Sequence, residues 1–262
     1  MIPKTLHLCW LSGDAYPTKI AKCINSWKRV MPDYEIILWD TRRFDLNQSA
    51  WVREAFEQKK YAFAADYIRF YALYTMGGIY LDSDVEVLKR FDDLLDLPYF
   101  IGAEKAGTPE AAIIGAEKGC DWVKQCLDYY DRRHFVKADG SIDIRKLPEI
   151  MVEQIAKLKP IRTLSLEESL QVLNSQDDNP MIRKHFDRKV VVLNDAFFSP
   201  KVFDSREVEL TPFTYAIHHY QNSWFSPKAK VYYRTRTFLI RLLGYQNVSK
   251  AEHLLMPWKF GR

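Results

Sequence analysis

Apolar and polar residues alternate with two different periods along this chain. Some short stretches are apolar throughout or change at every second residue, as in strands buried on one or both faces. Others repeat at three and four residues, as Ile20, Ile24 and Trp27 do, which is typical of an amphipathic helix. The predicted strands are 5–11, 35–39, 79–81, 99–103, 111–115, 190–193 and 215–219, and the predicted helices are 17–30, 49–58, 62–76, 121–133 and 146–158. This order predicts an α/β fold with a mixed sheet, beginning with a β-α-β unit.

The composition agrees with a folded globular domain. Of 262 residues, 47% are hydrophobic and 27% are charged, which excludes a disordered or fibrous chain. The four cysteines form no C-x-x-C pair, which favours reduced thiols over a zinc site or a disulfide framework. No run of 18 apolar residues occurs, and the N-terminal apolar stretch is too short for a signal peptide. We therefore expect a cytoplasmic protein.

Charge divides the chain into an acidic body and a basic tail. Eight basic residues and one acidic residue lie from Lys228 onward, so this tail carries +7 and leaves −3 for the rest of a chain of net charge +4. We expect a catalytic domain over 1–227 and a helical tail over 228–262. The uneven charge argues against nucleic-acid binding by the whole domain and favours a local contact with an anionic surface.

Four charged residues around a Gly-Gly break carry the clearest chemical signal. Asp66 and Arg69 are three residues apart on a predicted helix and share a face. Asp82 and Asp84 are two apart just beyond the predicted strand 79–81 and share a side. Paired carboxylates attract a hard cation such as Mn²⁺ or Mg²⁺, which can bridge a diphosphate. Alone, a D-x-D sequence is more often a solvated turn, but a strand end is where open α/β sheets bind ligands.

Two other kinds of site that contain a D-x-D sequence fit this chain less well. A phosphatase of the haloacid dehalogenase type has Thr or Val four residues after its first Asp, where this chain has Glu86. A calcium loop that starts at Asp82 would need glycine at its sixth position, where this chain has Val87. The phosphatase remains an alternative, as does a domain that binds a nucleotide sugar without transferring it.

The D-x-x-R helix, the Gly-Gly break and the Y-L-D-x-D segment resemble glycosyltransferase family 32. This family includes compact bacterial enzymes of polysaccharide synthesis and is distantly similar to clostridial glucosylating toxins and yeast initiating mannosyltransferases. The resemblance extends to I-P-K-T-L-H-L-C-W at residues 2–10, to S-W-K at 26–28 followed by P-D-Y-E and L-W-D, and to I-I-G-A-E at 113–117. It covers about the first 120 residues.

The resemblance implies a GT-A fold, a Rossmann-like nucleotide-binding domain on a mixed central sheet with additional C-terminal helices. Trp10 would stack on the nucleobase, although a core tryptophan is the alternative. Asp66 and Arg69 would hold the donor sugar and its phosphates, with a surface ion pair as the alternative, and Tyr80 would lie near the ribose or diphosphate. The implied catalytic residues are Asp66, Arg69, Asp82 and Asp84, and the implied donor-binding residues are Trp10, Leu8, Tyr80, Asp82, Ser83 and Trp224.

A second match lies near the C-terminus, in the sequence A-I-H-H-Y-Q-N-S-W. Adjacent residues of a strand point to opposite sides, so only one of His218 and His219 can reach a given metal ion. Alignment on the tryptophan of the family favours His219, with Asn222 near the metal and Trp224 at the diphosphate. The alternative is that neither histidine binds metal. The implied metal ligands are Asp84, Asp82, His219 and Asn222, and the implied ion is Mn²⁺ or Mg²⁺.

The resemblance implies a retaining hexosyltransferase that uses a nucleotide sugar, with UDP-galactose or UDP-glucose preferred. The acceptor would be a saccharide or lipid-linked saccharide in capsular or surface polysaccharide synthesis. In the basic tail, apolar residues lie at helical spacing between cations, so we expect peripheral contact with the inner face of the plasma membrane through 228–243. The residues of this contact would be Lys230, Arg234, Arg236 and Arg241 at the headgroups, with Phe238, Leu239 and Leu242 inserted shallowly.

Overall fold

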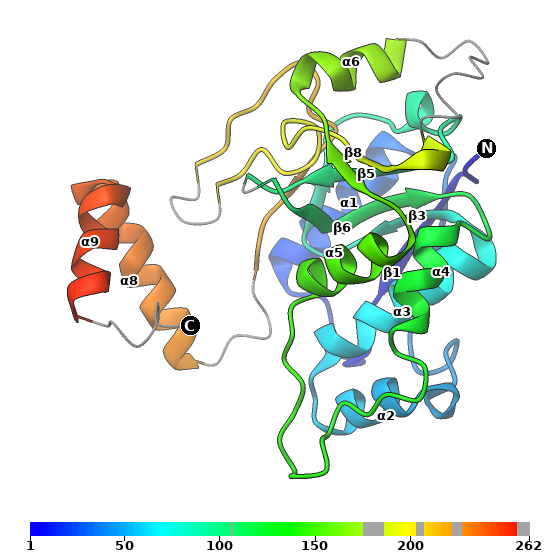
Figure 1. Ribbon diagram of the computed structural model, residues 1–262, viewed down its shortest axis with the longest axis horizontal. Helices are drawn as coiled ribbons and strands as arrows, with labels where there is room; N and C mark the ends of the chain where they lie inside the picture. The colour runs from blue at the N-terminus through cyan, green and yellow to red at the C-terminus, as the bar shows by residue number, and fades with distance from the viewer. Residues whose placement is uncertain (106, 175–185, 203–206, 222–226, 256–262) are drawn as a thin grey trace.

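A computed structural model of the chain describes residues 1–105, 107–174, 186–202, 207–221 and 227–255 (Figure 1). Its strands are β1 (Thr5–Cys9), β2 (Glu35–Trp39), β3 (Gly78–Leu81), β4 (Val85–Val87), β5 (Tyr99–Ala103), β6 (Pro109–Ala116), β7 (Ile161–Thr163), β8 (Val190–Val192) and β9 (Ala216–His218). Its helices are α1 (Thr18–Val30), α2 (Ala50–Glu57), α3 (Tyr61–Met76), α4 (Asp121–Asp128), α5 (Leu147–Leu158), α6 (Leu166–Asn174), α8 (Pro227–Leu243) and α9 (Tyr245–Leu255). Short 3-10 turns lie at Leu46–Gln48 and Asp92–Leu94.

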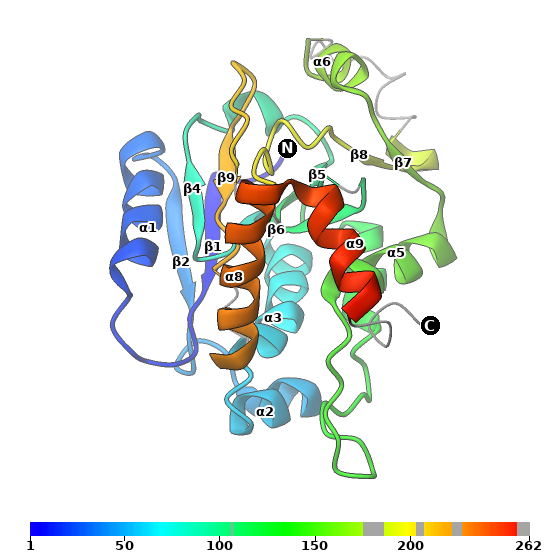
Figure 2. The same ribbon diagram turned by 90° about the vertical axis from the view of Figure 1, so that its left-hand side faces the viewer.

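The centre is a five-stranded sheet with the order β2-β1-β3-β6-β5. β1, β2 and β3 are parallel, whereas β6 is antiparallel to both of its neighbours. Figure 2 shows α1 on one side of this sheet and α3 and α5 on the other, so both faces are covered. The predicted mixed α/β fold is confirmed. Because β1 and β3 run side by side, their carboxyl ends meet at one edge of the sheet.

The Gly-Gly break ends α3 and turns the chain directly into β3. Gly77 has φ +71° and Gly78 has φ +108°, both in the region that favours glycine. A Cβ at Gly77 would lie 2.7 Å from the backbone nitrogen of Lys118, and one at Gly78 would lie 2.7 Å from the backbone oxygen of Thr5. Other residues would therefore both strain the backbone and clash. The short turn fixes α3 against β3 and brings their functional residues close together.

A small second sheet forms from segments far apart in the sequence. β4 pairs antiparallel with β9, with Val85 opposite His218 and Val87 opposite Ala216. Residues of α1 hold β4 in place, since Trp27 Nε1 donates to the Val85 carbonyl at 2.7 Å. The strand predicted over 215–219 is β9, but β4 and its pairing with β9 were not predicted, because β4 is only three residues long and its partner lies more than a hundred residues away.

Most other predicted elements are confirmed with shifts at their ends. The strand predicted over 5–11 ends at Cys9. The helix predicted over 121–133 ends at Asp128, because residues 129–132 form turns in which Tyr130 packs against Trp51 at a centroid distance of 5.0 Å. β7 and α6 were not predicted. The four cysteines are unpaired. Among the described residues, no helix combines the length and apolar character needed to cross a membrane.

His7 is a buried polar residue in β1 that connects three segments. It is 0% exposed, its Nε2 donates to the Gly77 carbonyl at 2.7 Å, and its Nδ1 accepts from Trp39 Nε1 at 3.1 Å. Both hydrogen bonds together require the neutral ring with its proton on Nε2. Burial lowers the pKa of His7 below its ordinary value, and the bond to Gly77 offsets this only in part.

We expect His7 to make the free energy of unfolding smaller as the pH falls from about 6.5 to about 5.5. In this range the unfolded chain binds a proton on His7 more readily than the folded chain does, because the pKa of His7 is lowered by folding, and the slope is at most about 1.4 kcal/mol per pH unit. Urea denaturation of wild type and His7→Gln at both pH values measures the difference, and the variant should lose less. His134→Gln, at a side chain 63% exposed, is the matched control and should behave like wild type. Equal slopes for wild type and His7→Gln would refute this assignment.

Candidate functional site

Two carboxylates and an imidazole meet just beyond the carboxyl end of β3. Asp82 and Asp84 lie in the turn from β3 into β4, and the pairing of β9 with β4 brings His218 to them. One possible ligand atom from each of these three residues lies within 4.8 Å of the others. Ligands that are each about 2.1 Å from one Mg²⁺ lie about 3 to about 4 Å apart, so small side-chain movements suffice. This donor set fits a hard divalent ion.

The two adjacent histidines point to opposite sides of the chain. His218 places its Nε2 3.5 Å from Asp84 Oδ1. His219 places its Nε2 2.8 Å from Glu86 Oε2 and its Nδ1 3.4 Å from Lys201 Nζ. This placement corrects the sequence-based choice of His219, because the register of β9 on β4 turns His218 toward the carboxylates.

Behind His218 lies a carboxylate that the sequence analysis did not single out. Glu110, in β6, is 2% exposed, and its Oε2 lies 3.3 Å from Nδ1 of His218. The same oxygen accepts from Ser199 Oγ at 3.0 Å and Tyr220 OH at 3.2 Å, and Oε1 accepts from a backbone N–H at 3.0 Å. With Nδ1 facing Glu110, Nε2 of His218 faces Asp84. A lone Glu in an apolar strand carries no sequence signal, so only the fold identifies this residue.

Burial and neighbouring charges have opposite effects on the pKa values of Glu110 and His218. Burial by itself would raise the pKa of Glu110, but His218 and the hydrogen-bond donors hold that pKa well below its ordinary value. Burial by itself would lower the pKa of His218, but Glu110 and Asp84 raise that pKa well above its ordinary value. The imidazole therefore balances the negative charge of the carboxylates around it.

Arg69 is the second centre of the site. It is 4% exposed, and its Nη2 lies 3.3 Å from Asp66 Oδ1 and 3.1 Å from Asp82 Oδ1. Nη1 donates to the carbonyl of Ala111, and the guanidinium lies over the ring of Tyr80 at 4.5 Å. Burial raises the pKa of Asp66 to about 7 against the opposing effect of Arg69. The alternative of a surface ion pair is therefore excluded, because this cluster lies inside the fold.

The predicted donor-binding residues differ in how much of their side chains they expose. Trp10 follows β1 and is half-buried, with its Nε1 donating to the Asp14 carbonyl at 2.8 Å and its ring edge-on to Tyr16 at 5.0 Å. Leu8 and Tyr80 are 2% and 1% exposed. Of these residues, only Trp10 presents part of its ring outside the core, and any donor contact of Leu8 would come from its main chain.

The chain after β9 returns to the D-x-D turn. Ser83 is half-buried between the two aspartates, and the backbone N–H of Gln221 donates to Asp84 Oδ2 at 2.7 Å. The predicted contacts of Asn222 and Trp224 lie outside the described residues.

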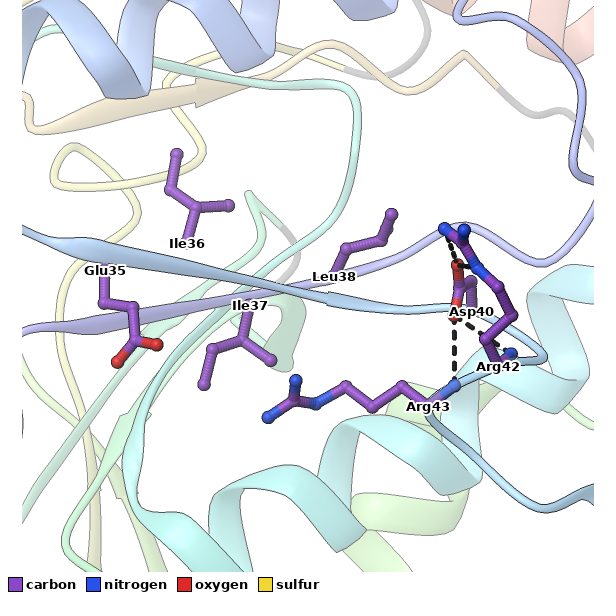
Figure 3. A pocket seen from close by; sticks show the side chains of 7 residues that line it. All are labelled: Glu35, Ile36, Ile37, Leu38, Asp40, Arg42 and Arg43. Carbon is purple, nitrogen blue, oxygen red and sulfur yellow. Dashed lines mark hydrogen bonds and ion pairs between the residues drawn. The ribbon is translucent and has the colours of Figure 1, made fainter.

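A shallow hollow along the edge strand β2 is separate from this cluster (Figure 3). Arg42 bonds to Asp40 there at 2.9 and 2.7 Å. β1 lies between β2 and β3 in the sheet, so the hollow does not open onto the D-x-D turn. The residues that line it are Glu35, Ile36, Ile37, Leu38, Asp40, Arg42 and Arg43.

Comparison with known proteins gives relatives for part of the chain. "Inositol phosphoceramide mannosyltransferase 3" of Schizosaccharomyces pombe is 30% identical over 130 residues, which are 48% of this chain and 36% of that protein. An uncharacterized glycosyltransferase of Acanthamoeba polyphaga mimivirus is 25% identical over 180 residues, 64% of this chain and 72% of the viral protein. The chain thus spans about a third of the fungal protein and most of the viral one.

Among solved structures, PaToxG glycosyltransferase is similar with a TM-score of 0.47 and 21% sequence identity, over 67% of this chain and 73% of that one. The family of the glycosyltransferase sugar-binding region containing a DXD motif matches residues 17–101. This segment runs from α1 to β5 and contains the Arg69 cluster and both aspartates of the D-x-D turn. Residues 17–101 of this chain are therefore similar to the sugar-binding region of the DXD-containing glycosyltransferases.

Proposed function

We propose that this protein transfers a hexose from a UDP-sugar, with UDP-galactose or UDP-glucose preferred, to a hydroxyl group of an acceptor. The observation that carries the proposal is the group of Asp82, Asp84 and His218 at the carboxyl edge of the sheet, whose two aspartates lie in the segment that matches the DXD family. Ligands of open α/β sheets bind at this edge. Retention of anomeric configuration rests on the family resemblance.

In this proposal some residues of the cluster bind the metal ion and others hold these ligands in position. Asp82, Asp84 and His218 would hold Mn²⁺ or Mg²⁺, which when bound neutralises negative charge on the departing diphosphate. Glu110 engages Nδ1 of His218 and so directs Nε2 to the metal side. Asp82 also bonds Arg69, which fixes the carboxylate that faces the donor. The side chains are therefore ordered before the donor arrives.

The acceptor proposal has separate support. The fungal relative is named for inositol phosphoceramide, a lipid acceptor. We extend this to a lipid-linked saccharide in capsular or surface polysaccharide synthesis, acted on by a cytoplasmic enzyme at the inner face of the plasma membrane.

Calorimetric titration of UDP and GDP tests the donor site without knowledge of the acceptor. We expect UDP to bind in the presence of Mn²⁺ and not in EDTA. His218→Ala should weaken this binding at least about tenfold because it removes one ligand, and His219→Ala is the matched control on the neighbouring residue and should leave it unchanged. If neither nucleotide binds with Mn²⁺, the proposal fails. Binding of a UDP-sugar without release of UDP in the presence of candidate acceptors would instead indicate a domain that binds the donor without turnover.

A further inference from the structure

α8 and α9 form a helical hairpin that stands away from the α/β body (Figure 1). The side of α8 that faces α9 is packed against it. Ile240 and Val248 are 6% and 5% exposed, and Arg236 Nε lies 2.9 Å from Glu252 Oε1. The hairpin thus has a small core and an ion pair of its own.

The opposite side of α8 carries an exposed apolar strip. Val231, Phe238 and Leu242 are 63%, 64% and 67% exposed. Their spacings of seven and four residues place them on one face of the helix, and Ile240 is about half a turn away from that face. The strip therefore faces away from α9. Burial of Phe and Leu side chains is favourable, so their joint exposure calls for a partner.

Exposed cations border the strip. Lys228, Arg234 and Arg241 are exposed on α8, and Lys250 is exposed on α9. The chain from Lys228 onward carries +7, against −3 for the rest. The partner of this face is therefore both apolar and anionic.

We propose that this outer face of α8 docks on a lipid bilayer that contains anionic headgroups. Val231, Phe238 and Leu242 enter the boundary of the acyl chains, and the flanking cations meet the headgroup phosphates. A nucleic acid would match the charge but leave the apolar strip exposed to water. Phe238 and Leu242 were already expected in this contact from the sequence, and Val231 joins them. Arg236 and Leu239 were also expected there, but Arg236 turns to Glu252 and Leu239 is half-buried, so neither belongs to the outer face.

The hairpin also lies close in the chain to the D-x-D turn. Pro227 follows Gln221 by six residues, and six residues span at most about 20 Å. The backbone of Gln221 is bonded to Asp84. A docked hairpin would therefore hold the candidate site near the bilayer surface, although the docking itself does not depend on the transfer reaction.

Vesicle co-sedimentation of the full chain tests the docking. We expect it to pellet with vesicles of equal parts phosphatidylcholine and phosphatidylglycerol, to pellet poorly with phosphatidylcholine alone, and to be released by high salt. Phe238→Ser with Leu242→Ser should lower the partition coefficient at least about tenfold. Ile144→Ser with Leu158→Ser is the matched control, at exposed apolar residues of the body, and should leave the coefficient unchanged.

A second pair of variants tests the charge. Lys228→Gln with Arg234→Gln should lower the partition coefficient about 30-fold, since each cation near an anionic surface contributes about 1 kcal/mol. Lys118→Gln with Arg132→Gln removes two exposed cations of the body and is the control.

The docking proposal is overturned if the wild-type chain does not pellet with the anionic vesicles, or if the α8 variants pellet as wild type does. It is also overturned if light scattering shows a dimer that Phe238→Ser with Leu242→Ser converts to a monomer while vesicles recruit no protein, because a second copy would then cover the strip. Circular dichroism of each variant checks that the full chain is folded. UDP binding measured on the same samples is independent of these outcomes and separates a failed donor site from failed docking.

Discussion

Asp84→Asn should lower the turnover number for sugar transfer at least about a hundredfold and remove Mn²⁺-dependent binding of UDP. Asp84 is 9% exposed, its Oδ1 lies 3.5 Å from Nε2 of His218, and its Oδ2 accepts from the backbone of Gln221 at 2.7 Å. Asparagine keeps the shape of the side chain and one oxygen acceptor. It removes the negative charge, which is the property that a divalent ion requires.

The measurement is release of UDP from UDP-galactose and UDP-glucose with a panel of saccharide acceptors, together with calorimetric titration of UDP. Asp131→Asn is the matched control, since its carboxylate is 74% exposed and lies 3.9 Å from Nε of Arg132. It should keep wild-type turnover. Turnover of Asp84→Asn within about threefold of wild type would remove Asp84 from the metal site and, with it, the metal-assisted mechanism.

Arg69→Met should reduce the free energy of unfolding by about 3 to about 5 kcal/mol. The arginine is buried between Asp66 and Asp82 and covers the ring of Tyr80. Methionine fills a similar volume but leaves two carboxylates without their cation in a site of low polarity. Urea denaturation at neutral pH measures the loss.

A second substitution distinguishes charge from packing at this position. Asp66→Asn in the Arg69→Met background should restore part of the lost stability, because it removes a buried carboxyl group that, without Arg69, must either stay charged in the core or take up a proton on folding. Arg42→Met, at a side chain 87% exposed and paired with Asp40, is the matched control and should change stability by less than about 0.5 kcal/mol. If Arg69→Met were as mild as this control, or Asp66→Asn gave no rescue, the buried cluster would not stabilise the fold through its charges.

Local periodicity was enough to predict the first half of the fold. The β-α-β unit, α3 and the Gly-Gly break depend on interactions among residues close in sequence, so each can be recognised from a local sequence pattern. Gly77 and Gly78 show this clearly, because the left-handed conformation that they adopt is one that other residues disfavour. The Asp66 and Arg69 pair also followed from helical spacing alone.

Partners far apart in the sequence were harder to predict. The sequence could say that only one of His218 and His219 faces the carboxylates, because strand geometry requires it. It could not say which, because the answer depends on the register of β9 against β4, a strand of three residues that periodicity does not reveal. Glu110 was missed for the same reason, since its role arises only when β6, β9 and Ser199 are packed together.

The fold class, the position of the D-x-D turn at a strand end and the basic character of the tail could thus be inferred from the chain alone, because each depends on residue type and short-range spacing. The packed fold was needed to show which histidine joins the carboxylates, which buried glutamate supports it, and which face of α8 is exposed. These features depend on strand register and on the packing of one helix against another. Both are set by the summed burial of residues distant along the chain.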